Sequence, residues 1–252
     1  MIGVFALALI GFFVWGQMGD GPGLDHANCP EDGSYAAQVA ILVDPSDSLT
    51  AVQRSVVPRI LETIELDAPT TAEIRVYALA RAGRGDTASV LRTCVPVHPD
   101  DVSSRTGNPR IAAREYEEFA TSLRSELSAL VDVQGDVVSP LIEGIQVAVV
   151  SAFRPRTSNM PRQLMIVSDM LQNSPAMSFY RDAVDFGPLS RNPDYGTLRV
   201  DLSGVEVSVF LLARGGEAGR LQAGNMRRFW EDYFLDQGAH PAARPRWVNV
   251  EG

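Results

Sequence analysis

Residues 38–48 read Gln38-Val39-Ala40-Ile41-Leu42-Val43-Asp44-Pro45-Ser46-Asp47-Ser48, and this stretch decides the fold. Residues 39–43 are all apolar, which is typical of a strand buried on both faces of a parallel sheet. The apolar run stops at Asp44, and a proline follows at once. The stretch therefore predicts a central strand whose carboxyl end carries acidic and hydroxyl side chains.

The rest of the chain alternates between strand and helix patterns. Further strands are predicted over 73–80, 89–97, 163–169 and 205–213, and helices over 49–64, 116–130, 141–153 and 226–234. A glycine-containing turn at 82–86 makes the second and third strands an antiparallel hairpin. The alternation predicts an α/β fold: a doubly wound, mostly parallel sheet with one antiparallel edge strand and helices on both faces.

Four parts of the chain are predicted from these patterns. An N-terminal membrane anchor or signal covers 1–19, a polar linker covers 20–34, the α/β domain covers 35–238, and a tail covers 239–252. Within the domain, residues 172–203 are expected to be irregular. Gly238 is expected to end the last helix.

Composition and charge exclude several classes of protein. The 252 residues include 22 basic and 31 acidic side chains, for a net charge of −9, so we expect no nucleic-acid partner. All the basic residues are arginines, and lysine is absent. A lysine-free chain has no Walker A nucleotide loop, no Schiff-base lysine and no Ser-x-x-Lys acyl-enzyme site.

The first nineteen residues carry no charged side chain and are largely apolar. As a helix they would span about 28 Å, enough to cross a hydrocarbon core. A cleavable signal peptide is the alternative, but it needs a basic start and a small-x-small cleavage site, and residues 15–18 offer no such site. We predict an uncleaved single-pass anchor in a bacterial inner membrane, with the domain facing the periplasm or the cell exterior.

Oxygen donors follow three separate segments of the predicted fold. Asp44, Ser46 and Ser48 follow the first strand at a spacing of two, Ser139 lies where a loop enters a helix, and Asp169 ends a later strand. In doubly wound sheets, ligands bind beyond the carboxyl ends of the strands, where these segments would converge. Carboxylates and hydroxyls without His or Cys are the ligands of a hard cation such as Mg²⁺, Mn²⁺ or Ca²⁺.

On these residues the chain resembles the von Willebrand factor type A domains over roughly residues 35–238. The metal-ion-dependent adhesion site of that family has an Asp-x-Ser-x-Ser motif after the first strand, which Asp44, Ser46 and Ser48 match in full. A later Asp of the family matches Asp169, and the family's Thr position falls on Ser139, which keeps the hydroxyl. The resemblance implies that these five residues hold a divalent cation directly or through water. It also implies that an Asp or Glu of a protein partner completes the shell.

Each candidate ligand also has a simpler explanation. Asp47 or Ser48 could cap the first helix, and Ser139 before Pro140 is a good N-cap. Asp44 could owe its extended backbone to Pro45, and Asp169 could be an ordinary strand-end residue.

The chain has two cysteines, Cys29 and Cys94. An even pair beyond an anchor indicates an oxidising compartment, and two free buried thiols are the alternative. Cys29 precedes the first strand, and Cys94 ends an antiparallel strand, so both are expected at the sheet edge opposite the metal motif. We predict a disulfide between them.

Three functions fit the sequence. The first is an envelope-anchored, cation-dependent protein-binding module without enzymatic activity. The second is a Mg²⁺-dependent hydrolase, for which the sequence offers no general base near the site. The third is a structural component of an envelope assembly with a vestigial metal site.

Overall fold

The structure is a computed structural model, and it describes residues 23–44, 46, 49–79, 87–103, 105, 107–132, 138–153, 159–239 and 245–251. The predicted anchor at 1–19, the predicted turn at 82–86 and Ser48 lie outside the described residues. Over the ranges given above, no helix combines the length and the apolarity that crossing a membrane requires.

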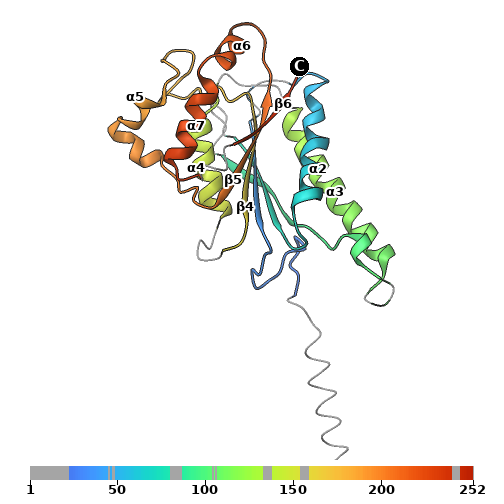
Figure 1. The fold of residues 1–252 in the computed structure, drawn as a ribbon. Helices are drawn as coiled ribbons and strands as arrows, with labels where there is room; N and C mark the ends of the chain where they lie inside the picture. The colour runs from blue at the N-terminus through green and yellow to red at the C-terminus, as the bar shows by residue number, and fades with distance from the viewer. Residues whose placement is uncertain are drawn as a thin grey trace, which may run out of the picture.

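Six strands form one sheet in the order β3-β2-β1-β4-β5-β6 (Figure 1). Their bounds are β1 Gln38–Val43, β2 Glu73–Ala78, β3 Ala88–Cys94, β4 Arg162–Ser168, β5 Val205–Leu212 and β6 Arg246–Val250. The described strands pair in parallel, except that β3 runs antiparallel to β2 at one edge. The predicted mostly parallel sheet with one antiparallel edge strand is therefore confirmed.

Helices cover both faces of the sheet, as predicted (Figure 1). One face packs against α2 (Val56–Asp67) and α3 (Pro109–Val131), and the other packs against α4 (Leu141–Ala152) and α7 (Met226–Asp236). The shorter helices are η1 Gln53–Ser55, η2 Pro99–Asp101, α5 Phe186–Ser190, η3 Pro193–Leu198 and α6 Gly216–Ala223.

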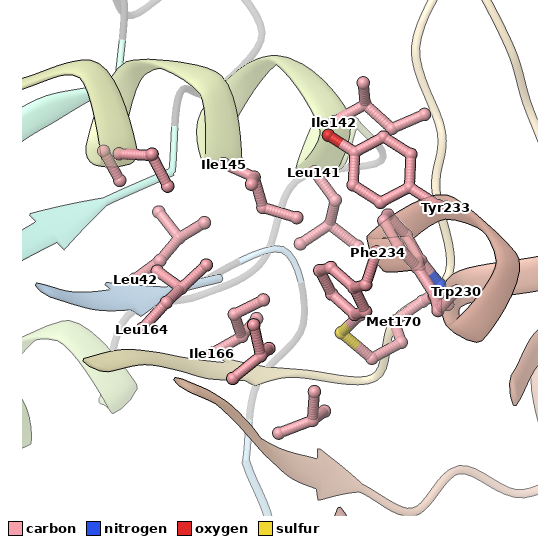
Figure 2. Close-up of a cluster of buried hydrophobic side chains, with 14 of the residues drawn as sticks. Leu42, Leu141, Ile142, Ile145, Leu164, Ile166, Met170, Trp230, Tyr233 and Phe234 are labelled. Atoms are coloured by element: carbon pink, nitrogen blue, oxygen red, sulfur yellow. The ribbon is translucent and has the colours of Figure 1, made fainter. Parts of the chain in front are cut away.

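Alternate side chains of β1 enter two different hydrophobic cores. Val39, Ile41 and Val43 belong to the core under α2 and α3, whereas Ala40 and Leu42 belong to the core under α4 and α7. Figure 2 shows the second core, where Leu42 and neighbours on β4 face α4 and the aromatic side chains of α7. Burial on both faces explains why the sequence of β1 is an unbroken apolar run.

Three predicted segments differ in the structure. The helix predicted from residue 49 begins later, with the single turn η1 before α2, and Val52 is 58% exposed instead of packing. The predicted tail at 239–252 contains β6, which extends the sheet beside β5. The stretch 172–203 contains two short helices, α5 and η3. Gly238, with a φ of +90°, follows the end of α7 as predicted.

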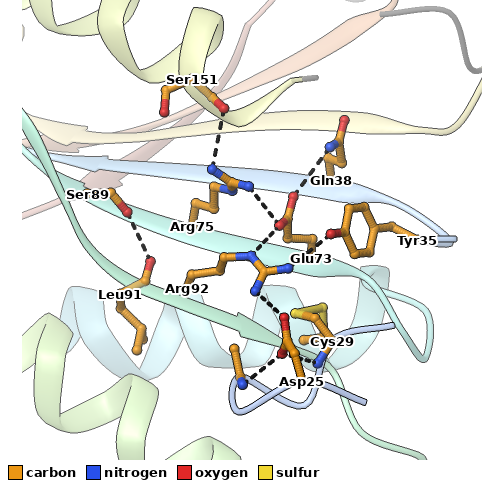
Figure 3. Close-up of polar contacts among 12 residues, drawn as sticks. Asp25, Cys29, Tyr35, Gln38, Glu73, Arg75, Ser89, Leu91, Arg92 and Ser151 are labelled. Carbon is orange, nitrogen blue, oxygen red and sulfur yellow. Dashed lines mark hydrogen bonds and ion pairs between the residues drawn. A yellow bond between two sulfur atoms is a disulfide. The ribbon is translucent and has the colours of Figure 1, made fainter. Parts of the chain in front are cut away.

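The disulfide predicted between Cys29 and Cys94 is present, with Cα atoms 5.0 Å apart. Figure 3 shows it beside a set of charged side chains at the amino ends of β1 and β2. Arg92 of β3 donates to Asp25 at 2.7 Å and to the buried Glu73 at 2.7 Å. The disulfide and the ion pair thereby attach the segment 23–34, predicted as a linker, to β3, at the end of the sheet opposite Asp44.

Candidate metal centre

Asp44 and Asp169 lie at the same edge of the sheet because they follow neighbouring parallel strands. Val43 at the end of β1 pairs with Val167 of β4, and the backbone N–H of Asp44 donates to the carbonyl of Val167 at 2.9 Å. Both acids are only 3% exposed. The two strands thus bring together two buried carboxylates from positions far apart in the sequence.

Among the described residues, three donors hold the carboxylate of Asp44. The hydroxyls of Ser139 and Ser168 each donate to its Oδ2 at 2.8 Å, and the backbone N–H of Ser46 donates to its Oδ1 at 2.9 Å. Ser139 and Ser168 are themselves buried. Two of the other predicted ligands therefore contact Asp44: Ser139 through its hydroxyl and Ser46 through its backbone N–H.

The position of Ser139 is fixed by the loop that follows β4. Its backbone N–H and carbonyl form two hydrogen bonds with Asn173, at 2.9 and 2.8 Å. The N-cap residue of α4 is Pro140, without a side-chain capping bond. The N–H of Ile142 in the first turn donates to the side chain of Gln172 at 3.0 Å, and the Ser139 hydroxyl donates to Asp44, so the simpler explanation of Ser139 as a helix cap is wrong.

Asp169 is positioned by an unusual backbone turn. The next residue, Met170, has a φ of +61°, which is uncommon for a residue with a side chain. Its N–H donates to the Ser168 hydroxyl at 2.8 Å, and its carbonyl accepts from the buried Trp230 indole of α7 at 2.8 Å. The N–H of Leu171 then donates to Oδ1 of Asp169 at 2.9 Å. The turn, anchored in the core, thereby orients the Asp169 carboxylate.

Arg214 pairs with the other oxygen of Asp169. Its Nε lies 3.1 Å from Asp169 Oδ2, and the two side chains are 12% and 4% exposed. Burial, followed by the negative charge of Asp44, raises the pKa of Asp169 to about 7, although Arg214 acts in the opposite direction. The rise caused by Asp44 means that the two carboxylates repel each other in this site.

The donor set fits a hard divalent cation. Two buried carboxylates that repel each other gain from a positive charge placed between them, and serine hydroxyls beside them are ordinary ligands for such an ion. In the described part of the chain, no group of three or more His, Cys, Asp or Glu side chains is arranged to hold a metal ion. The candidate centre would consist of two acids and neighbouring hydroxyls, and its ligand set remains a prediction. Ser48 remains a prediction, because it lies outside the described residues.

Two residues of the site were not predicted. Ser168 precedes Asp169 at the end of a buried strand, and its role as a donor to Asp44 depends on the register between β1 and β4. Arg214 comes two residues after the end of β5, the strand next to β4. Arg214 comes directly after the strand predicted over 205–213, and a charged residue in that position is the signal that could have placed it at this edge.

No protein-family model matches the chain, and no curated protein matches it. Among solved structures, it is similar to an aerotolerance-related membrane protein from Bacteroides fragilis, at 15% identity and a TM-score of 0.41, covering 85% of this chain and 91% of that one. The SpRpn10 VWA domain is 12% identical with a TM-score of 0.42, and 85% and 87% of the two chains are covered. Manganese-loaded TRAP protein from Plasmodium vivax is 15% identical with a TM-score of 0.35, and the coverage is 75% and 63%.

Proposed function

Given its von Willebrand factor type A-like fold, we propose that this chain is a protein-binding module that acts through the carboxyl edge of its sheet. Asp44, Ser46, Ser139 and Asp169, together with Ser48, would hold Mg²⁺, Mn²⁺ or Ca²⁺ there. An Asp or Glu of the partner would complete the shell. The observation that carries the proposal is the buried carboxylate of Asp44, which accepts the Ser139 hydroxyl one strand away from Asp169.

The chemistry of the site favours an acidic partner. Two carboxylates balance the charge of one divalent cation, and neutral hydroxyls add no further charge. A bound cation could therefore still bind a carboxylate of the partner, because hard cations prefer oxygen ligands and accept six or more of them. The cation's part is to supply a fixed positive charge at the edge of the sheet, and the protein's part is to hold it in place.

The contact between Arg214 and Asp169 favours a second candidate function. A guanidinium already neutralises one of the two acids, as expected of a site that has lost its metal. In this alternative the chain is a structural component of an envelope assembly. Retained assembly in an Asp44→Ala variant would support the alternative over the cation-dependent module.

The membrane location belongs to the same proposal. We propose that residues 1–19 anchor the chain in the membrane and that the domain lies outside the cytoplasm. The disulfide supports this, because disulfides persist in oxidising compartments. Cys94 pairs with Glu73 at the amino end of β2 and is bridged to Cys29, so both cysteines lie at the end of the sheet opposite Asp44. The candidate centre would therefore face away from the membrane, toward a partner.

The test is a crosslinking pull-down with the full chain, with and without a chelator. Asp44→Ala serves as the site variant and Asp100→Ala, at an exposed position of η2, as the matched control. We expect a partner that is lost with the chelator and in Asp44→Ala but is retained in Asp100→Ala. If neither the chelator nor Asp44→Ala changes the capture of the partner, the proposal of a cation-dependent module is overturned. Hydrolysis of a phosphate or ester probe that depends on Mg²⁺ and on Asp44 would instead show an enzyme.

A further inference from the structure

We propose that Arg214 is an internal cation that competes with the divalent ion for Asp169, so that metal binding requires its guanidinium to leave the site. This inference rests on the proposed function, since it concerns the same centre. It assigns a regulatory role to a residue outside the five predicted ligands. The competition would set how much free cation the module needs before it can engage a partner.

The position of Arg214 follows from the strand order. β5 lies beside β4, and Leu211 of β5 pairs with Ser168. Arg214, three residues beyond Leu211, is thus carried to the same edge as Asp169, where its Nε contacts Oδ2 at 3.1 Å. With the Arg214 side chain 12% exposed, the ion pair is poorly screened by solvent.

The backbone of Arg214 is clamped by α6. The N–H of Arg214 donates to the side chain of Gln222 at 2.8 Å, and the amide of Gln222 donates to the carbonyls of Asp169 and Leu212, both at 2.9 Å. A Cβ on Gly219 would lie 2.3 Å from the Arg214 carbonyl oxygen, so α6 approaches this backbone as closely as only glycine allows. One glutamine thereby ties together the backbones of both members of the ion pair.

The charges of the site make the competition necessary. With both carboxylates ionised, Asp44, Asp169 and Arg214 together carry one net negative charge. A divalent cation added to this set would leave one net positive charge in a buried site, and the cation and guanidinium would repel each other at short range. If the guanidinium swings into solvent, the two carboxylates and the cation are balanced. The long arginine side chain can make this movement while α6 keeps the backbone in place.

The experiment is a calorimetric titration of Mn²⁺ into the full chain. The site variant is Arg214→Gln, and the matched control is Arg220→Gln, which removes the same charge from an exposed position on α6. We expect Arg214→Gln to bind Mn²⁺ about tenfold more tightly than wild type, because the competing charge is gone. Arg220→Gln should match wild type. Without metal, Arg214→Gln should have the lower melting temperature, and saturating Mn²⁺ should close that gap.

A second measurement follows Arg214 in the wild-type chain, so it does not depend on the uncharged variant Arg214→Gln. With ¹⁵N-labelled arginine, the Nε–H of Arg214 in the wild-type chain is followed while diamagnetic Mg²⁺ is added, and its signal is assigned by its loss in Arg214→Lys. We expect the proton to exchange slowly with water in the metal-free chain and quickly when the ion is bound. A proton that stays protected at saturating Mg²⁺ would show that the ion pair survives and would overturn the inference.

The outcomes separate this inference from the proposed function. Equal or weaker Mn²⁺ binding in Arg214→Gln, with binding still lost in Asp44→Ala, overturns the competition but leaves the metal centre intact. No Mn²⁺ binding in wild type or in Arg214→Gln overturns the cation-dependent function, and the competition with it.

Discussion

The hydroxyl of Ser139 lies 2.8 Å from Oδ2 of Asp44, although 95 positions separate the two residues in the sequence. The same oxygen accepts the hydroxyl of Ser168. Ser168 ends β4 and Ser139 precedes α4, so the folded sheet creates the pocket of polar groups around Asp44. The following variants test whether this arrangement serves a cation or only satisfies a buried acid.

Asp44→Ala should abolish divalent-cation binding, because it removes a carboxylate and leaves hydroxyls, which alone are weak ligands. It also leaves the buried Ser139 and Ser168 hydroxyls without this acceptor, which costs about 1–3 kcal/mol of folding free energy for each. Calorimetry with Mg²⁺ and thermal unfolding measure the two effects separately. Equal Mg²⁺ affinity in the variant and in wild type would remove the site assignment.

Ser139→Thr should bind the cation as well as wild type or more tightly. Threonine offers the same hydroxyl, and its stiffer χ1 holds that hydroxyl in fewer orientations. Ser139→Ala should lose affinity.

Ser168→Ala is the matched control for Ser139, because it removes a donor to the same Asp44 oxygen but leaves every predicted ligand in the chain. We expect Ser168→Ala to lower the melting temperature but to keep cation binding. A large loss of binding in Ser139→Thr, or equal losses in the two alanine variants, would show that Ser139 only positions Asp44.

How far the sequence predicts this molecule can be judged from particular residues. The apolar run of β1 predicts burial on both faces, and the strand ends place Asp44 and Asp169 at one edge. β6 was not predicted from the sequence. It is an edge strand of five residues, and its partly exposed side chains show no clear alternation of apolar and polar residues. The ion pair between Arg214 and Asp169 was not predicted either. Sequence can place a side chain near an edge of the sheet, but the strand register and the packing of α6 decide which carboxylate it meets.

The Cys29–Cys94 disulfide should stabilise the domain by closing a long loop. The bridged cysteines are 65 residues apart, and removing such a bridge costs about 2–4 kcal/mol. The paired variant Cys29→Ser/Cys94→Ser should therefore unfold at lower denaturant concentration than wild type under oxidising conditions. Under reducing conditions the two should coincide. Mass spectrometry of thiol-blocked protein isolated without reductant should find no alkylated cysteine, and finding two would also remove the support for an extracytoplasmic location.

The ion pair between Arg92 and Asp25, which lies beside the disulfide, predicts a pH dependence of stability. The Arg92 guanidinium, which donates to Oδ2 of Asp25, lowers the pKa of Asp25 from 3.8 to about 2, and the backbone N–H of Cys29 acts in the same direction. A carboxyl whose pKa is lower in the folded chain stabilises that chain above its unfolded pKa, and this contribution is lost as pH falls toward the folded value. Wild type should thus lose this contribution between about pH 4 and pH 2.

Asp25→Asn, which keeps an oxygen for the backbone donors but loses the charge, should be less stable than wild type at pH 6 and should approach it at pH 2. Urea unfolding at a series of pH values measures this difference, with the exposed Asp101→Asn as the control that follows wild type. A difference between wild type and Asp25→Asn that stays constant from pH 6 to pH 2 would show that the charge of Asp25 does not contribute to stability.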